Sequence, residues 1–75
     1  MEILLFGQLA DIAGTAKVNT DAVADTDALK AVLEERFPGL MQVKYLLAVD
    51  KNVVQSKTVL KGNEIIALMP PFSGG

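Results

Sequence analysis

One segment of the chain has the spacing of an amphipathic helix, and it limits the folds open to 75 residues. Its apolar residues fall at i, i+3, i+4 and i+8 and so share one stripe of a helix: Leu29, Val32, Leu33 and Phe37. Asp25 or Thr26 can accept hydrogen bonds from the N–H groups of the first turn, and Asp27 favours that positive end. The spacing therefore predicts the one substantial helix of the chain.

The sequence also predicts where this helix ends and which of its residues face water. Pro38 disfavours helical geometry at Phe37, and Gly39 permits the chain to reverse, so we expect the helix to end there. Three polar residues lie off the stripe and are expected to face water: Lys30, Glu34 and Glu35.

Short apolar runs bounded by turn residues predict β-strands on either side of the helix. The predicted strands cover residues 3–6, 17–20, 45–49, 53–54 and 65–69. Residues 8–14 are expected to form a loop or one helical turn. Residues 50–52 and 61–63 are predicted turns, the second with Gly62 at positive φ. Pro70 and Pro71 end the last strand because neither can donate a ladder hydrogen bond.

These elements predict a single α+β domain over residues 1–75, in which one main helix packs on one face of a mixed sheet. If Ile3 and Leu5 face the helix, the intervening Leu4 and Phe6 face away. In the last strand, either the odd-numbered or the even-numbered residues of 65–69 must also face away from the helix. Apolar side chains thus lie on a face that the helix does not cover, and either loops or a protein partner could cover them.

Composition excludes several functions. The chain has no cysteine and no histidine, which removes disulfides, thiolate nucleophiles, the usual zinc ligands and the usual general base. No metal site is expected. Seven basic and nine acidic residues give a net charge of -2 without a basic stripe, so nucleic acid is a poor partner. The apolar run at the N-terminus is too short for a signal peptide or a membrane span, so we expect a cytoplasmic protein.

The most distinctive chemical group left is the C-terminus, Gly74-Gly75. Two glycines have no Cβ to block a narrow channel, so an enzyme could reach the terminal carboxylate. Once adenylated, that carboxylate becomes an acyl donor to sulfur or to an amine, and the chain would be a carrier rather than a catalyst. Residues 70–75 are expected to form a flexible protruding tail that reaches on the order of 20 Å. Terminal glycines also occur by chance.

Two segments resemble one family. Residues 61–75, Lys-Gly-Asn-Glu-Ile-Ile-Ala-Leu-Met-Pro-Pro-Phe-Ser-Gly-Gly, resemble the C-terminal signature of the MoaD family, the small sulfur-carrier subunit of molybdopterin synthase. Leu-Phe-Gly-Gln-Leu at residues 5–9, followed by Ile-Ala-Gly at 12–14, is similar to that family's first strand and loop. The resemblance implies a ubiquitin-like β-grasp fold with the first and last strands parallel and central.

The resemblance also implies a mechanism. An E1-like adenylyltransferase would use ATP to activate Gly75, and a sulfurtransferase system would convert it to a thiocarboxylate, a 1-thioglycine. The large synthase subunit would accept the tail in a heterotetramer and supply the catalytic side chains. There the Gly75 thiocarboxylate would give sulfur to cyclic pyranopterin monophosphate, forming the dithiolene of molybdopterin. No cofactor bound to the chain itself is expected.

The residue roles follow from the same resemblance and from the uncovered apolar face. The segment expected to insert into the partner precedes Gly75 and comprises Pro70, Pro71, Phe72, Ser73 and Gly74. The residues expected to contact the partner are Leu4, Phe6, Met69 and Phe72. Two positions depart from the family pattern: Asn63, where aspartate is frequent, and Phe72, where a smaller apolar residue is frequent.

Three alternatives stay open. A thiamine-type sulfur carrier shares the fold and the Gly-Gly end but generally lacks the paired prolines. A ubiquitin-like modifier would use the same activated Gly75, with a lysine amine in place of sulfur. A plain binding module would have an inert tail.

Overall fold

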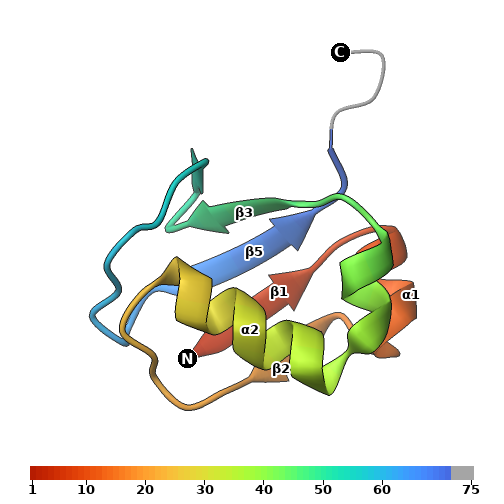
Figure 1. The fold of residues 1–75 in the computed structure, drawn as a ribbon, viewed down its shortest axis with the longest axis horizontal. Coiled ribbons are helices and arrows are strands. Elements are labelled where there is room, and N and C mark those ends of the chain that lie inside the picture. The colour runs from red at the N-terminus through yellow and green to blue at the C-terminus, as the bar shows by residue number, and fades with distance from the viewer. Residues whose placement is uncertain (72–75) are drawn as a thin grey trace.

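The computed structural model describes residues 1–71, which form a five-stranded mixed sheet with helices on one side (Figure 1). The strand order is β2-β1-β5-β3-β4. The strands are β1 (Glu2–Leu5), β2 (Lys17–Asn19), β3 (Leu46–Val49), β4 (Asn52–Val54) and β5 (Ile65–Met69). This is the ubiquitin-like β-grasp expected from the sequence, and the predicted strands differ from the observed ones by a residue or so at their ends.

The first and last strands lie side by side at the centre of the sheet and run parallel. Ile3 is opposite Ile66, and Leu5 is opposite Leu68. Antiparallel partners flank this pair, β2 beside β1 and β3 beside β5. Ladders on both sides satisfy the backbone groups of β5, so the strand that leads to the C-terminus is held on both edges.

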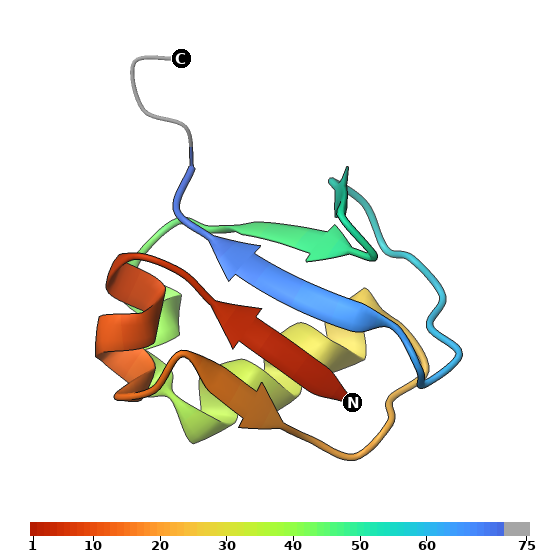
Figure 2. The ribbon, with the colours of Figure 1, turned by 180° about the vertical axis from the view of Figure 1, so that it is seen from behind.

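Helix α2 (Thr26–Arg36) crosses one face of the sheet. Its N-cap is Asp25, whose Oδ1 accepts a hydrogen bond from the N–H of Ala28 at 2.8 Å. It ends at Arg36, one residue before the proline-restricted Phe37, and the 3₁₀ helix η1 (Pro38–Gln42) follows. Seen from behind, the opposite face of the sheet carries no helix anywhere in residues 1–71 (Figure 2).

The buried line of α2 differs from the predicted stripe. Leu29 and Leu33 are fully buried, but Val32 is 39% exposed, and Thr26 is buried instead. Thr26 is fixed by two hydrogen bonds to Thr58: its N–H donates to the Thr58 carbonyl, and its Oγ1 accepts from the Thr58 N–H, both at 3.0 Å. These bonds fasten the start of the helix to the segment before β5 and turn the side of the helix that carries Val32 outward.

One further expectation was wrong. Glu34 does not simply face water, because its carboxylate accepts a hydrogen bond from the Tyr45 hydroxyl at 2.7 Å. Helix α2, with 11 residues, is the main helix as predicted, and the segment expected to be a loop or one helical turn is a six-residue helix, α1 (Gln8–Ala13). Such a short helix is unstable alone. Here the fully buried Leu9 fastens it to the core, and Gly14 ends it in the left-handed conformation, donating to the Ala10 carbonyl at 2.8 Å.

The core lies between α2 and the sheet, and among residues 1–71 its buried side chains are apolar apart from Thr26. Ile3 and Leu5 face it, as predicted, and in β5 the even-numbered residues, Ile66 and Leu68, do so too. The odd-numbered residues of β5 therefore lie on the open face. None of the helices in the described residues is both long and apolar enough to span a bilayer.

Candidate functional site

The open face of the sheet is hollowed over its central strands. A depression of about 550 Å³ lies there. Its apolar lining consists of Leu4, Phe6, Ala48, Ile65, Ala67 and Met69. The strand register explains this grouping, since Ala67 is paired with Leu4 on one side and with Ala48 on the other. We call this surface the open-face hollow.

Several large apolar side chains of the hollow are exposed to solvent. Phe6 is 47% exposed and Ile65 is 51% exposed, while Leu4 and Met69 are half-buried. The two small residues, Ala48 and Ala67, form its floor because their methyl groups leave room between the larger side chains. A contiguous exposed apolar surface of this kind is typical of an interaction site.

The hollow adjoins the point where the chain leaves the sheet. The N–H of Phe6 donates to the carbonyl of Leu68 at 3.0 Å, which continues the parallel pairing one residue past β1. This bond places Phe6 beside the end of β5, where Met69 is followed by the half-buried Pro70 and the exposed Pro71.

Three of the residues predicted to contact a partner are thus brought together: Leu4, Phe6 and Met69. Their role in binding stays a prediction. The other predicted site residues, Phe72, Ser73, Gly74 and Gly75, lie outside the described residues, and so does most of the predicted tail at 70–75.

The far end of the hollow is the β3–β4 turn, which the sequence reading did not assign to the site. Asp50 and Lys51 line the hollow there, and both have positive φ, 48° and 74°. Asp50 fastens the turn to β5: its N–H donates to the Ile65 carbonyl, and its Oδ1 accepts from the Ile65 N–H, both at 2.9 Å. Lys51 is exposed and forms no ion pair with any described residue.

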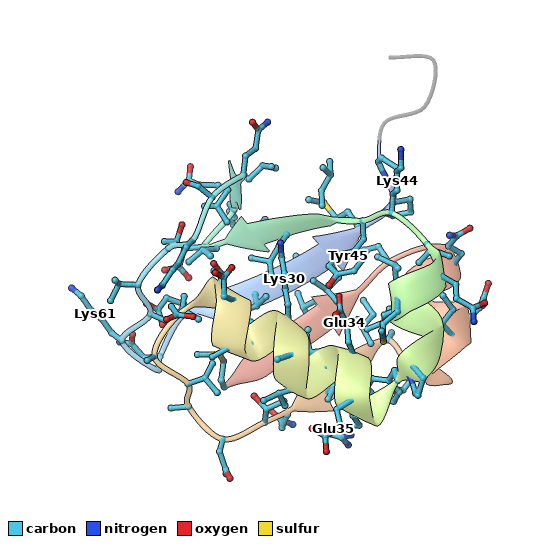
Figure 3. All side chains as sticks on the ribbon, viewed as in Figure 1. Lys30, Glu34, Glu35, Lys44, Tyr45 and Lys61 are labelled. Carbon is cyan, nitrogen blue, oxygen red and sulfur yellow. The ribbon has the colours of Figure 1, made fainter. Side chains whose placement is uncertain are left out.

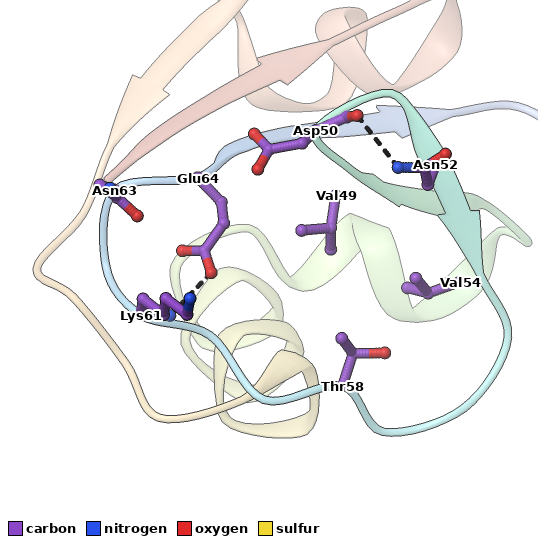
Figure 4. A pocket seen from close by; sticks show the side chains of 8 residues that line it. All are labelled: Val49, Asp50, Asn52, Val54, Thr58, Lys61, Asn63 and Glu64. Atoms are coloured by element: carbon purple, nitrogen blue, oxygen red, sulfur yellow. Dashed lines mark hydrogen bonds between the residues drawn. The ribbon is translucent and has the colours of Figure 1, made fainter.

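A second depression of about 510 Å³ lies on the other side of this turn and is partly polar (Figure 4). The Glu64 carboxylate on its wall accepts hydrogen bonds from the backbone N–H of Lys61 at 2.7 Å and of Gly62 at 2.9 Å. These two N–H groups stabilise the carboxylate and lower the pKa of Glu64 below its ordinary value. The carboxylate is thus engaged in the turn, where Gly62 has the expected positive φ of 110°.

Asn63 also lines this second depression. It therefore lies at the opposite end of β5 from Pro70. The charge lost at this position, relative to the family pattern, is remote from the segment expected to carry the chemistry.

The helix side of the molecule offers no competing site in the described residues. Figure 3 shows Glu34 of α2 directed at Tyr45, whereas Glu35 lies on the opposite side of the helix. Burial of the phenol and its hydrogen bond to Glu34 raise the pKa of Tyr45 above its ordinary value. Between residues 1 and 71 no three carboxylates gather as a metal site would require. The open-face hollow and the adjoining end of β5 are the candidate functional site.

Comparison with known proteins supports this fold and identifies a family. The sequence model of the ThiS family matches residues 3–75. The chain is similar to the solution structure of small archaeal modifier protein 1 from Methanosarcina acetivorans, with a TM-score of 0.84 and 21% identity over 99% of this chain and 94% of that one.

Two crystal structures of small archaeal modifier protein 1 from Haloferax volcanii are also similar, each at 26% identity. One has a TM-score of 0.76 and covers 93% of this chain and 94% of that chain. The other has a TM-score of 0.71 and covers 99% of this chain and 97% of that chain.

Proposed function

The chain belongs to the ThiS family, and on this basis we propose that it is a cytoplasmic sulfur carrier whose reactive group is the terminal carboxylate of Gly75. More specifically, we propose that it is the small subunit of a molybdopterin synthase, the role implied by the MoaD-like ending of its sequence. The observation that carries the proposal is that the family match runs through residue 75 and so includes the Gly-Gly end.

The fold supports this role because the strand that leads towards Gly75 is held on both edges. Strand β5 is paired on both edges and leads directly into Pro70. Five residues follow Pro70 in the sequence. The two prolines stiffen this exit, and the two glycines keep the end slim enough for a narrow channel. No described side chain is needed for the chemistry.

The chemistry would take place on the carboxylate. An E1-like adenylyltransferase would join Gly75 to the AMP part of ATP, releasing pyrophosphate and forming an acyl adenylate. Attack by hydrosulfide (HS⁻) on the acyl carbon would then form the C–S bond, break the acyl–phosphate bond and release AMP, leaving a thiocarboxylate. The protein carries sulfur in this form and binds no cofactor of its own.

The open-face hollow would hold the large synthase subunit. Phe6 and Met69 lie where the chain leaves the sheet, so a partner seated on them also lies next to the entry of the tail. Pro70 to Gly74 would pass into that subunit and deliver the Gly75 thiocarboxylate to cyclic pyranopterin monophosphate. Each dithiolene needs two sulfur atoms, so a spent carrier must leave and docking must be reversible.

A second function is favoured by the structural matches. The Haloferax proteins, 26% identical to this chain, are described as small archaeal modifier proteins. The same acyl adenylate could be attacked by a lysine amine of a target protein, which would form an isopeptide bond instead of a thiocarboxylate. A thiamine-type carrier is less favoured because of Pro70-Pro71.

Mass spectrometry of the protein from its own cells separates these functions. Trypsin cleaves after Lys61, the last basic residue, so residues 62–75 form one peptide that contains Gly75. A carrier gives this peptide with one oxygen exchanged for sulfur, and a modifier gives it attached to a lysine of another protein. Finding only the free carboxylate in cells that make molybdenum cofactor would contradict both.

Reconstitution then tests the specific carrier role. The thiocarboxylate form, mixed with the large synthase subunit and cyclic pyranopterin monophosphate, should yield molybdopterin, and the carboxylate form should not. No product from the thiocarboxylate form would leave the family assignment intact and refute the molybdopterin role.

A further inference from the structure

We propose that Gly7 is a positioning residue, whose bare backbone provides a seat for the Pro70 ring and so fixes the direction in which the chain leaves the sheet towards Gly75. The inference rests on the proposed function for its consequence, but the seat itself is visible in the described residues. A Cβ added to Gly7 would lie 2.8 Å from Cγ and 3.4 Å from Cδ of Pro70.

The Gly7 side of this contact is rigid. Gly7 has φ 59° and ψ -136°, a conformation that residues with a Cβ rarely adopt. Its carbonyl accepts from the N–H of Ala10 at 3.1 Å, at the start of α1. The preceding residue, Phe6, is bonded to Leu68 of β5. The backbone at Gly7 is thus fixed between the sheet and a helix.

The Pro70 ring cannot rotate away from a methyl group on Gly7 as a flexible side chain would. The proline ring closes on its own backbone nitrogen, so pushing Cγ away moves the main chain of Pro70. Pro71 follows and restricts Pro70 to extended backbone conformations, which removes the rotation that could absorb the push. A methyl group on Gly7 must therefore shift the end of β5 or change the direction of the chain beyond Pro71.

This change in direction matters because the reacting carbon is at Gly75, five residues further on. A reacting group displaced by about 1 Å can lose about 100-fold in rate. We expect Gly7→Ala to lower kcat/KM for adenylation of Gly75 by at least about tenfold.

Two variants separate the contact from general strain at a glycine. Gly14 has a φ of 75° but nothing within 4 Å of an added Cβ, so Gly14→Ala introduces backbone strain without a clash. Pro70→Ala removes both Cγ and Cδ, the two atoms that the new methyl would meet. In the Pro70→Ala background, Gly7→Ala should therefore have a smaller effect than in the parent, because only the backbone strain at Gly7 is left.

The direction of the tail is measured independently of activity. Since the chain has no cysteine, Ser73→Cys provides a unique site for a nitroxide label, and the label's paramagnetic broadening of backbone amides maps where the tail points. We expect Gly7→Ala and Pro70→Ala each to change the pattern of broadened amides and Gly14→Ala to leave it as in the parent. Adenylation is followed in parallel by ATP–pyrophosphate exchange on the unlabelled variants.

The outcomes are distinct. The seat is refuted if Pro70→Ala leaves the broadening pattern unchanged, and this test does not require Gly7→Ala to fold. It is also refuted if Gly7→Ala has the same effect in the Pro70→Ala background as in the parent. The positioning role is refuted if Gly7→Ala alters the pattern but is adenylated at the parent rate. If the pattern responds as expected but the parent chain is never adenylated, the seat stands and the proposed function fails.

Discussion

Truncation of Phe6 tests the open-face hollow most simply, because this ring is the largest side chain in it. About half of Phe6 is exposed in the free protein, 47% by area. A phenylalanine buries roughly 200 Å² in full, so about 90 Å² would be removed from water by a partner. At about 25 cal/mol per Å², this area is worth ~2 kcal/mol. Phe6→Ala should therefore weaken docking by about 30-fold.

Isothermal titration calorimetry with the large synthase subunit measures this effect. The buried half of the ring also contributes to stability, so Phe6→Ala should lower the free energy of unfolding by ~2 kcal/mol, and circular dichroism must show that the variant is folded. Met41→Ala is the matched control: Met41 lies on η1, is 69% exposed and does not line the hollow.

The control should bind as the parent does. An affinity of folded Phe6→Ala within about twofold of the parent, or an equal loss for Met41→Ala, would refute the assignment of the hollow as the docking surface.

Three further predictions concern the fold that presents this surface. Leu33→Ala should lower the free energy of unfolding in urea by about 2–5 kcal/mol, because Leu33 is a fully buried residue of α2, and a loss below about 1 kcal/mol would contradict that packing. Asp25→Ala should lower the free energy of unfolding by ~1 kcal/mol because it removes the helix cap, and an unchanged urea midpoint would mean that the cap does not stabilise the fold. The raised pKa of Tyr45 means that its contribution to stability is complete below about pH 10, the ordinary value for tyrosine, and falls as pH rises further. Urea titrations above that pH should show a shallower decline for Tyr45→Phe than for the parent, and equal slopes would refute this linkage.

Much of the scaffold could be predicted from local signals in the sequence. The pair Asp25 or Thr26 and the later Pro38 marked the ends of α2, because capping and proline restriction act over a few residues; the cap is Asp25. The alternation in β1 assigned Leu4 and Phe6 to the open face, because successive strand residues point to opposite sides.

The rest depended on contacts between distant residues. Val32 and Thr26 both border the helical stripe, and the buried one is Thr26, which is hydrogen-bonded to the distant Thr58. Helix α1 depends on burial of Leu9 rather than on its own propensity. The floor and far end of the hollow, Ala48 and Lys51, follow from the register of β3 on β5, which no local pattern fixes.

The central claim is that the reactive atom is the terminal carbonyl carbon of Gly75 and that the folded domain only presents it. The most direct measurement is ATP–pyrophosphate exchange by the E1-like enzyme on two forms of the protein that differ in one group, the natural Gly75 carboxylate and a Gly75 carboxamide. Both forms keep the fold, the hollow and every side chain. The account predicts exchange with the carboxylate and none with the carboxamide. Equal exchange with both forms would contradict it.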